Sequence, residues 1–414
     1  MPHTPNIRVL HLISTLGLGG AEQLLLTTAK HLDRSQYALR VIALSAPLDL
    51  APDFERIGIP VEHLGLRGSL DWHRGLFRLA GRLKSYRPQI LHTHLPYANF
   101  YGRLAGLMAG VPIFATTLHS TEYSHWESTR LRFRVRRAID VAAARWLPIH
   151  YLSISECVKE DYRRHVGLSD VDVLYNYIDP SGFGPLAPER SRQIRESFGW
   201  GAEAFVLVTI GRCDVRKGHR YLLEAMPAII AAIPTARLLI VGDGPEEQTL
   251  RHLAKRLNIE HHVTFAGRRR DIALLLGMAD VFVFPSIAEG LGIALIEAMA
   301  SRLPVIASRV EGIREVLTDG IQGVLIPPER PEAIQAAVRT LYANPQARVA
   351  LGRAARTSVE QRFSVTIGIA RLHAFYRRIM TTGGPVVVDQ LPALADLPDM
   401  AMSAQLSPKR IPAR

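Results

Sequence analysis

The sequence predicts an α/β protein built from two doubly wound, Rossmann-like domains. Three observations support this prediction. The chain has 414 residues, which is more than a single hydrophobic core usually spans. Short apolar runs rich in leucine and β-branched residues alternate with longer helical patterns. One stretch rich in proline and glycine, residues 179–201, interrupts this alternation and divides the chain in two.

The apolar runs are the expected strands. In the first half they are residues 7–14, 39–45, 89–94, 112–119, 151–155 and 171–176, and in the second half residues 205–212, 237–243, 263–267, 281–286, 304–308 and 323–327. Most of them are continuously apolar, which is typical of parallel strands buried on both faces. We therefore expect an N-terminal domain over residues 1–183, a linker over 184–200 and a C-terminal domain over 201–363.

The C-terminal end of the sequence reads as helical. Residues 331–344 and 345–361 are expected to be helices, with Pro345 at a first helical position, where its missing N–H costs nothing. Residues 364–380 predict a further helix with an apolar face, which we expect to pack back toward the N-terminal domain. Residues 381–414 predict a mobile tail.

Composition narrows the class of protein. The formal charge of +12 favours polyanions, anionic lipid headgroups or phosphorylated small molecules as partners. Cys157 and Cys213 lie far apart and belong to no zinc-type cluster, which indicates a reduced compartment. No run of about 18 apolar residues is present, and residues 7–18 lack the basic start of a signal peptide. We therefore expect a cytoplasmic protein.

The strongest chemical signal lies in residues 284–305. A buried strand is followed by a loop with Gly290 and Gly292 and then by a helix. Glycines let backbone amides approach a ligand, and the start of a helix presents free N–H groups that suit a diphosphate. Glu289 and Glu297 bracket the loop. An acid near a helix start can also be a simple dipole partner, but that role accounts for only one of the two.

A second signal follows the first strand of the second half. Arg212 and Lys217 lie in a short loop there, and a guanidinium together with an ammonium suits a pyrophosphate. In isolation this would be a solvated basic loop. Its place at the carboxyl end of a parallel strand favours a binding role, because ligands of open α/β sheets bind there.

The first half offers weaker signals. Residues 15–22 contain Gly19 and Gly20 and could cradle a phosphate or simply form a tight turn, since they match neither GxGxxG nor a P-loop. His92, His94 and His119 end two neighbouring strands. Metal binding would need further ligands, so we expect polar groups that line a cleft. For His92 and His94 a purely structural role is equally open, whereas His119 is expected to face the ligand.

Taken together, these residues resemble the family-4 retaining glycosyltransferases, whose GT-B fold places two Rossmann-like domains face to face across a cleft. The most specific element is the spacing of Glu289 and Glu297. Supporting elements are GRxxxxKG from Gly211, VGDGP from Val241, and Asn176 with Asp179. The resemblance covers nearly the whole chain.

The resemblance implies a role for each site residue. Glu289 and His119 are expected to face the donor sugar near the reacting centre, and Glu297 to bind the ribose. The expected donor-binding residues are Gly19, Gly20, Arg212, Lys217, Gly290, Leu291, Gly292, Ile293, Glu297 and Arg269. No metal and no cofactor are implied, because Arg212 and Lys217 neutralise the diphosphate.

The implied reaction moves a hexosyl group from a nucleotide-diphosphate sugar to a glycan or lipid-linked acceptor, in cell-surface polysaccharide or lipopolysaccharide synthesis. UDP is chosen as the nucleotide because such donors are common. Two alternatives stay open: a GT-B nucleotide-sugar epimerase, and a catalytically silent sugar-nucleotide-binding scaffold. A nucleic-acid binder is suggested by charge alone and by no binding motif, so no nucleic-acid partner is expected.

Two further features of the sequence can be interpreted only with the structure. The family usually has glycine where this chain has Arg302, at a position where glycine would form a left-handed helix cap. Residues 126–147 are rich in arginine and show apolar residues near one helical face. We expect a surface helix packed on its own domain, and as the sharper hypothesis a peripheral contact with an anionic membrane at its inner face.

Overall fold

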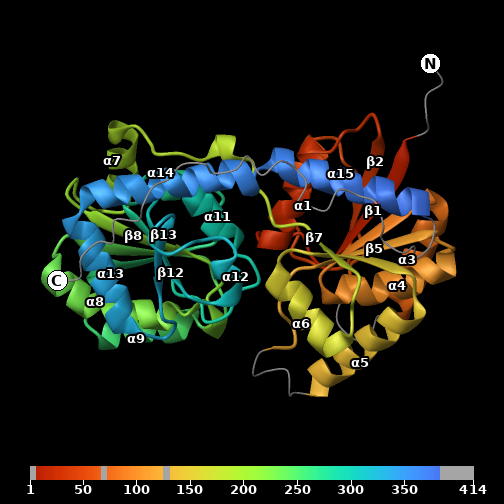
Figure 1. The fold of residues 1–414 in the computed structure, drawn as a ribbon, viewed down its shortest axis with the longest axis horizontal. Helices are drawn as coiled ribbons and strands as arrows, with labels where there is room; N and C mark the ends of the chain where they lie inside the picture. The colour runs from red at the N-terminus through yellow and green to blue at the C-terminus, as the bar shows by residue number, and fades with distance from the viewer. Residues whose placement is uncertain (1–5, 67–71, 125–130, 383–414) are drawn as a thin grey trace, which may run out of the picture.

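The computed structural model describes residues 6–66, 72–124 and 131–382. It contains two parallel sheets with helices on both faces, lying side by side (Figure 1). The first sheet has the strand order β3-β2-β1-β4-β5-β6-β7, and the second has the order β10-β9-β8-β11-β12-β13. In both orders the chain starts near the middle and winds outward in both directions. The prediction of two Rossmann-like, doubly wound domains is confirmed.

The N-terminal half contains strands β1 (Ile7–Ile13), β2 (Tyr37–Ala43), β3 (Val61–His63), β4 (Ile90–His94), β5 (Ile113–Leu118), β6 (Ile149–Ser153) and β7 (Val171–Val173). Its helices are α1 (Gly20–His31), α2 (Ala51–Arg56), α3 (Trp72–Tyr86), α4 (Pro96–Ala109), α5 (Leu131–Trp146) and α6 (Glu156–Val166). The sequence did not predict β3. This strand is three residues long, lies at the sheet edge and is only partly buried, so it lacks the apolar run that marks the other strands.

The C-terminal half contains strands β8 (Phe205–Ile210), β9 (Ala236–Val241), β10 (Val263–Gly267), β11 (Val281–Phe284), β12 (Val305–Ser308) and β13 (Gly323–Ile326). Its helices are α7 (Pro188–Ser197), α8 (His219–Ala232), α9 (Glu247–Arg256), α10 (Ile272–Gly277), α11 (Ile293–Ala300), α12 (Glu311–Arg314), α13 (Pro331–Ala343) and α14 (Pro345–Arg362). Every residue of the neighbouring strands β8, β11 and β12 is buried, which is why these strands read as continuous apolar runs.

The segment that the sequence assigns to a linker contains helix α7, which was not predicted. Arg195 on this helix donates hydrogen bonds to the carbonyl oxygens of Ala204 and Met278 and pairs with Asp280 at 3.1 Å. All three partners lie in the C-terminal half. Helix α7 therefore packs on that half, and its polar sequence hid it because most of its residues stay exposed.

The last helix, α15 (Val365–Thr382), crosses back over the N-terminal half (Figure 1, blue). Leu372, Phe375, Tyr376 and Ile379 are buried in the same core as strand β1. The crossing point is fixed by two backbone hydrogen bonds, from Ile178 to Phe363 and from Val365 to Ile178. The helix includes residues 381 and 382, which the sequence assigned to the tail, and the rest of that expected tail lies outside the described residues.

Helix α5 differs from its prediction. The apolar face proposed from the sequence includes Leu131, Val135 and Trp146, and these side chains are 73%, 52% and 75% exposed. The buried position of the helix is Ala143 instead. The expectation that the apolar face packs on its own domain is therefore wrong for these residues. Residues 126–130 of the same arginine-rich region lie outside the described part.

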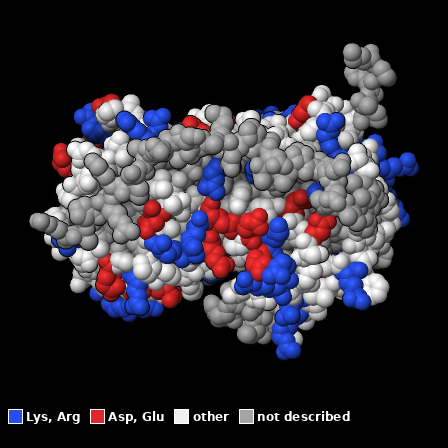
Figure 2. All heavy atoms as spheres, viewed as in Figure 1, with Lys and Arg blue, Asp and Glu red and all other residues white. Residues whose placement is uncertain are grey.

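Charges of both signs share the surface despite the net charge of +12. In Figure 2 acidic side chains gather at the boundary between the two halves, and basic side chains flank them. Helix α6 of the N-terminal half contacts helix α12 of the C-terminal half, and the two helices carry the acidic residues Glu156, Glu160 and Glu311. Within the described ranges, no helix combines the length and the apolar composition needed to span a bilayer.

Candidate active site

The loop that follows β11 meets the N-terminal half at several points. A Cβ atom added to Gly290 would lie 3.6 Å from the carbonyl oxygen of His119 and 3.5 Å from Cα of Ser120. A Cβ added to Gly20 would lie 3.4 Å from Cδ1 of Ile293. The structure thus brings Gly20, His119, Gly290 and Ile293 together, although they come from opposite halves of the chain.

The same loop is tied to the end of the N-terminal half by a side chain. The amide of Asn176 donates a hydrogen bond to the carbonyl oxygen of Leu291 at 3.0 Å, and Asn176 is buried. This contact fixes the loop between Gly290 and Gly292 from the opposite domain. Gly292 is the N-cap residue of α11, so the free amides of that helix start at this loop.

Lys217 and Glu289 form an ion pair inside the site. The Nζ atom of Lys217 donates to Oε2 of Glu289 at 2.5 Å, and the two side chains are 21% and 13% exposed. The ammonium also lies 5.0 Å from the centre of the Phe284 ring, a favourable cation–π distance. A cation and a carboxylate that the sequence placed in two separate motifs are therefore direct neighbours.

The other predicted cations are arranged differently. Arg212 is exposed on the loop that follows β8. Arg269 pairs with Asp271 at 2.6 Å, in its own domain, and is not brought to the other predicted residues. Its neighbour Arg268 pairs with Asp243 at 2.7 Å and lies 3.5 Å from Asp49 of the N-terminal half. Arg270 of the same loop pairs with Asp53 at 2.8 Å, so Arg268 and Arg270 both reach the N-terminal half.

Glu297 lines a cavity between the two halves. The cavity has a volume of about 150 Å³, and its walls include Gln23 and Thr27 of α1, Ile293 and Asp179. Burial raises the pKa of Glu297 to about 7. This carboxyl group therefore changes its charge near neutral pH, depending on what shares the cavity with it.

Two features beneath the loops were missed in the sequence. Glu22, in the first turn of α1, is buried and accepts a hydrogen bond from Thr15 at 2.8 Å, and its pKa is raised mainly by burial. It leaves no room for a side chain at Gly19, where a Cβ would lie 2.4 Å from the Glu22 carboxylate. Because acids are common in first helical turns, nothing in the sequence singled out Glu22.

The second missed feature is Gly312, in α12. A Cβ at this position would lie 2.3 Å from the carbonyl oxygen of Glu289 and 2.4 Å from that of Gly290. No side chain fits at such distances, so glycine lets α12 support the loop from below. The signal available in the sequence was only a lone glycine after a strand.

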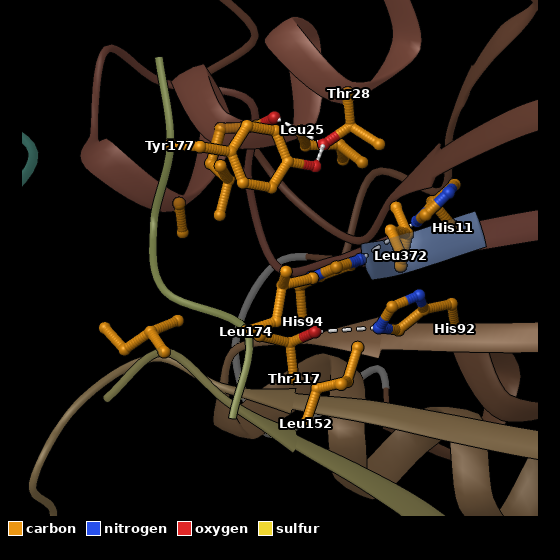
Figure 3. Close-up of a pocket in the computed structure, with 13 residues that line it drawn as sticks. His11, Leu25, Thr28, His92, His94, Thr117, Leu152, Leu174, Tyr177 and Leu372 are labelled. Atoms are coloured by element: carbon orange, nitrogen blue, oxygen red, sulfur yellow. Dashed lines mark hydrogen bonds between the residues drawn. The ribbon is translucent and has the colours of Figure 1, made fainter. Parts of the chain in front are cut away.

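Four histidines lie toward the carboxyl ends of the central strands β1, β4 and β5, on the side of the loop that follows β11. His11, His92 and His94 are buried, and Figure 3 shows their rings side by side at a small cavity. The Nε2 atom of His94 is 2.9 Å from Nδ1 of His11, and its Nδ1 atom is 3.1 Å from Nε2 of His119. The sequence grouped three of these residues but missed His11, which lies between leucines inside the largely apolar strand β1.

Burial lowers the pKa of all four histidines, to about 3 for His11 and about 4 for His119. All four imidazoles are therefore neutral at pH 7. This edge of the site offers hydrogen bonds without charge.

Three of the histidines also satisfy the distance expected of a metal site. Ligand atoms of His11, His92 and His94 lie within 4.8 Å of one another. However, both ring nitrogens of His94 bond other histidines, and those of His92 bond Tyr376 and Thr117, each at 2.7 Å. A metal ion would have to break these hydrogen bonds, so the observed arrangement favours a hydrogen-bonded network.

Comparison with known proteins identifies the family. The family described as "Glycosyltransferase Family 4" matches residues 18–181, and "Glycosyl transferases group 1" matches residues 190–358. EpsD of Bacillus subtilis (strain 168), a protein named as a glycosyltransferase, is 30% identical over 308 residues, covering 72% of this chain and 78% of that protein. The chain belongs to the family-4, group 1 glycosyltransferases.

Other relatives of this glycosyltransferase carry more specific names. A phosphatidyl-myo-inositol mannosyltransferase of Mycolicibacterium smegmatis is 29% identical over 388 residues, covering 89% of this chain and 93% of the relative. A UDP-Gal:alpha-D-GlcNAc-diphosphoundecaprenol alpha-1,3-galactosyltransferase of Escherichia coli is 30% identical over 260 residues, covering 61% and 66%. The two named relatives differ in donor and acceptor.

Solved structures agree on the fold of this glycosyltransferase. Anabaena HepE in complex with UDP and glucose superposes with a TM-score of 0.80 at 22% identity, covering 90% of this chain and 100% of the other. The sucrose-phosphate synthase of Thermosynechococcus elongatus has a TM-score of 0.76 at 21% identity, covering 91% and 100%. The GT-B fold expected from the resemblance is confirmed.

Proposed function

We propose that this glycosyltransferase moves a hexosyl group, with retention of configuration, from a nucleotide-diphosphate sugar to a glycan or lipid-linked acceptor. The observation that carries the proposal is the Lys217–Glu289 pair beside Gly290, directly opposite His119. UDP is the preferred nucleotide, because HepE was solved with UDP and a relative is named for UDP-Gal. The pathway proposed is cell-surface polysaccharide or lipopolysaccharide synthesis.

In this proposal each charged group has its own function. Lys217 and Arg212 neutralise the diphosphate that leaves, and the amides at the start of α11 stabilise its developing charge. A diphosphate that attracts the Lys217 ammonium also releases the Glu289 carboxylate from its ion pair. Glu289 is then free to accept hydrogen bonds from hydroxyl groups of the donor sugar. No metal ion and no cofactor are required in this proposal.

Retention follows if the acceptor attacks from the side of the leaving group. The bond between the anomeric carbon and the phosphate oxygen breaks, and the acceptor oxygen bonds to the same face of that carbon. The phosphate oxygen that departs takes the proton of the acceptor hydroxyl, so charge and atoms balance. NMR of the product tests this step, because the anomeric configuration of product and donor must agree.

Thermal stabilisation by UDP, GDP, ADP and their sugars tests donor binding. A ligand at about 100 times its Kd stabilises the native state by about 2.7 kcal/mol, which gives a measurable rise in Tm. We expect one nucleotide family to stabilise the wild type and to lose this effect in Lys217→Ala. If no nucleotide in the panel raises the Tm of the wild type, the donor proposal is wrong.

The two alternatives separate in a simple assay. A GT-B epimerase converts the nucleotide sugar without any acceptor, and a silent scaffold binds it without turnover. The paired Lys217 and Glu289 favour a transferase, because a binding scaffold has no need of a carboxylate beside the sugar. Incubation of the donor alone, followed by NMR, must show an unchanged sugar apart from slow hydrolysis, which excludes the epimerase, and slow hydrolysis that is faster than without protein excludes the silent scaffold.

We further propose that the enzyme works at the cytoplasmic side of an anionic membrane, which helix α5 contacts. Leu131 and Trp146 are 73% and 75% exposed at the two ends of α5, and Arg134, Arg137 and Arg145 are exposed on the same helix. Apolar side chains among cations suit the boundary between lipid headgroups and acyl chains. Sedimentation must show stronger binding to phosphatidylglycerol vesicles than to phosphatidylcholine vesicles, and Trp146→Ala with Leu131→Ser must weaken it. Equal binding to both vesicles excludes the contact.

A further inference from the structure

Three histidines form a continuous hydrogen-bonded chain that ends at the active site. His11 of β1 bonds His94 of β4, and His94 bonds His119, which follows β5. His94 is also held by ring stacking, with centroids 4.4 Å from His92 and 5.2 Å from His11. The chain runs from the buried centre of the sheet to the loop that faces Gly290.

The backbone after His94 supports a functional arrangement. Leu95 has φ +73° and ψ 153°, a combination that residues other than glycine rarely adopt. Such strain persists where the surrounding structure determines the conformation strongly, and it is concentrated at functional sites. The turn directly after His94 is therefore held in place by its surroundings.

Hydrogen-bond chemistry couples the tautomers of the three rings. Each neutral imidazole has one N–H and one acceptor nitrogen. In every link one ring must donate and the other accept, so the N–H groups of the whole chain point the same way. Either all of them point toward the buried end at His11, or all of them point toward the cleft at His119.

The buried end decides the direction. The Nε2 atom of His11 is buried and has no hydrogen-bond partner among the described residues. Orphaned buried N–H groups are rare in proteins, and an unsatisfied acceptor is tolerated better. The favoured state therefore places the proton of His11 on Nδ1, where it donates to His94, and the proton of His94 on Nδ1, where it donates to His119.

We propose that His11 and His94 are positioning residues that fix His119 as the Nδ1–H tautomer. His119 Nε2 is held as the acceptor, and its Nδ1–H is the donor presented to the sugar of the bound nucleotide sugar. The part of this inference that concerns the sugar rests on the proposed function, whereas the tautomer is a property of the free protein.

The matched control is His92. It is buried and stacked on His94, but its nitrogens bond Tyr376 and Thr117 and take no part in the chain. Replacement of His92 by Phe disturbs the same core without touching a link. An effect caused by packing alone therefore occurs in both variants. An effect of the histidine chain occurs only in His94→Phe.

Nitrogen NMR of the full-length protein labelled with ¹⁵N-histidine tests the tautomer directly. The wild type is expected to show His119, assigned by loss of its signals in His119→Gln, with a protonated Nδ1 and an unprotonated Nε2. His94→Phe must raise the Nε2–H population of His119, and His92→Phe must leave it unchanged. A wild-type His119 with its proton on Nε2 overturns the proposal, whether or not any variant folds.

Kinetics and binding extend the test to the reaction. His94→Phe is expected to lower kcat about tenfold, the loss of one ordinary hydrogen bond, with an unchanged Kd for UDP alone. His94→Gln, whose amide can donate to His119 and accept from His11, must recover most of that loss. Equal losses in the Gln and Phe variants overturn the proposal. Failure of the wild type to bind any nucleotide would instead contradict the proposed function and leave the NMR result valid.

Discussion

The two sides of the candidate active site differ in charge. The C-terminal edge carries charges, with the Lys217–Glu289 pair and the Glu297 carboxyl group at a pKa of about 7. The N-terminal edge carries neutral histidines, whose pKa values burial lowers to about 3 or 4 at His11 and His119. In the proposed function, the charged side meets the leaving diphosphate and the neutral side meets the donor sugar.

The difference also lies in how each edge is assembled. Lys217 and Glu289 belong to two loops that each follow one buried strand, so each loop is a compact motif. The histidine chain instead takes His11 from inside β1, His94 from the end of β4 and His119 from the loop after β5, and Tyr376 of the last helix supports it through a hydrogen bond to His92. The charged side of the site can therefore be recognised from short sequence motifs. The neutral histidine network cannot, because its residues meet only when the strands are assembled into the sheet.

The strongest way to test the charged edge is to remove Lys217. Lys217→Ala is expected to lower kcat/KM about 100- to 1000-fold, because a fixed cation at the developing charge is lost. The matched control is Arg216→Ala, which removes a neighbouring cation whose side chain pairs with Asp214 at 3.7 Å. Steady-state kinetics of both variants is the measurement. Similar losses in the two would mean that general positive charge, and no specific contact, binds the diphosphate.

The backbone support of the same edge comes next. Gly312→Ala places a methyl group against the carbonyl oxygens of Glu289 and Gly290 and is expected to cost about 1–3 kcal/mol of stability. Nucleotide affinity is expected to fall with it, because the loop must move. Gly201→Ala is the control, since no atom lies within 4 Å of the added Cβ. Denaturant unfolding and titration with nucleotide must show these losses in Gly312→Ala and not in Gly201→Ala. Normal nucleotide binding by Gly312→Ala would contradict the supporting role of α12.

The pH dependence separates the two edges. Between pH 8 and 6 the histidines stay neutral, whereas Glu297 gains a proton around pH 7. Ribose hydroxyls donate to a carboxylate, so affinity for the nucleotide sugar must weaken about tenfold over this range. Glu297→Gln must flatten the profile. Calorimetric titration is the measurement, and a profile that persists in the variant would assign the titration to another group.

The same ionisation acts on folding with the opposite sign. The pKa of Glu297 is higher in the folded protein than its ordinary value, so the folded state binds this proton more tightly. Its contribution to stability is therefore present at low pH and is lost as pH rises toward 7. Donor binding reverses this loss, because the ligand favours the ionised form.

The smallest effect concerns the far end of helix α11. Arg302 has φ +61°, so it forms the left-handed cap at which the family usually has glycine. Arg302→Gly is expected to stabilise the protein by about 1 kcal/mol and to leave nucleotide affinity unchanged. Arg302→Ala keeps a Cβ and must bring no comparable gain. Thermal unfolding of the three proteins decides, and an equal gain in both variants would place the effect in the side chain.

Much of the fold was readable because it depends on local patterns. The continuous apolar runs of β8 and β11 identify strands buried on both faces. The elements that the sequence did not predict lack such apolar patterns. Strand β3 is short and partly buried, and helix α7 is polar and held by the Arg195 guanidinium, so neither has an apolar pattern. The exposed Leu131 and Trp146 of α5 show that apolar spacing does not tell which face a protein buries.

The candidate site was also predicted in part. Glu289, Lys217 and Gly290 were identified from their spacing, and the structure brings them together. Arg269 was chosen from its loop, but it pairs with Asp271 in its own half, whereas its neighbours Arg268 and Arg270 reach Asp49 and Asp53 of the other half. One residue along a loop reverses the direction of a side chain, and spacing alone cannot resolve that.

By itself, the sequence determined the two Rossmann-like domains and the loops rich in glycine, because these follow from the periodicity and spacing of residues close in sequence. Tertiary structure decided which distant groups meet. Lys217 reaches a carboxylate 72 residues away, His11 a ring 83 residues away, and His92 a hydroxyl 284 residues away. Hydrogen bonds and desolvation depend on neighbours in space, so the neutral edge of the site exists only once the sheet and the last helix are packed together.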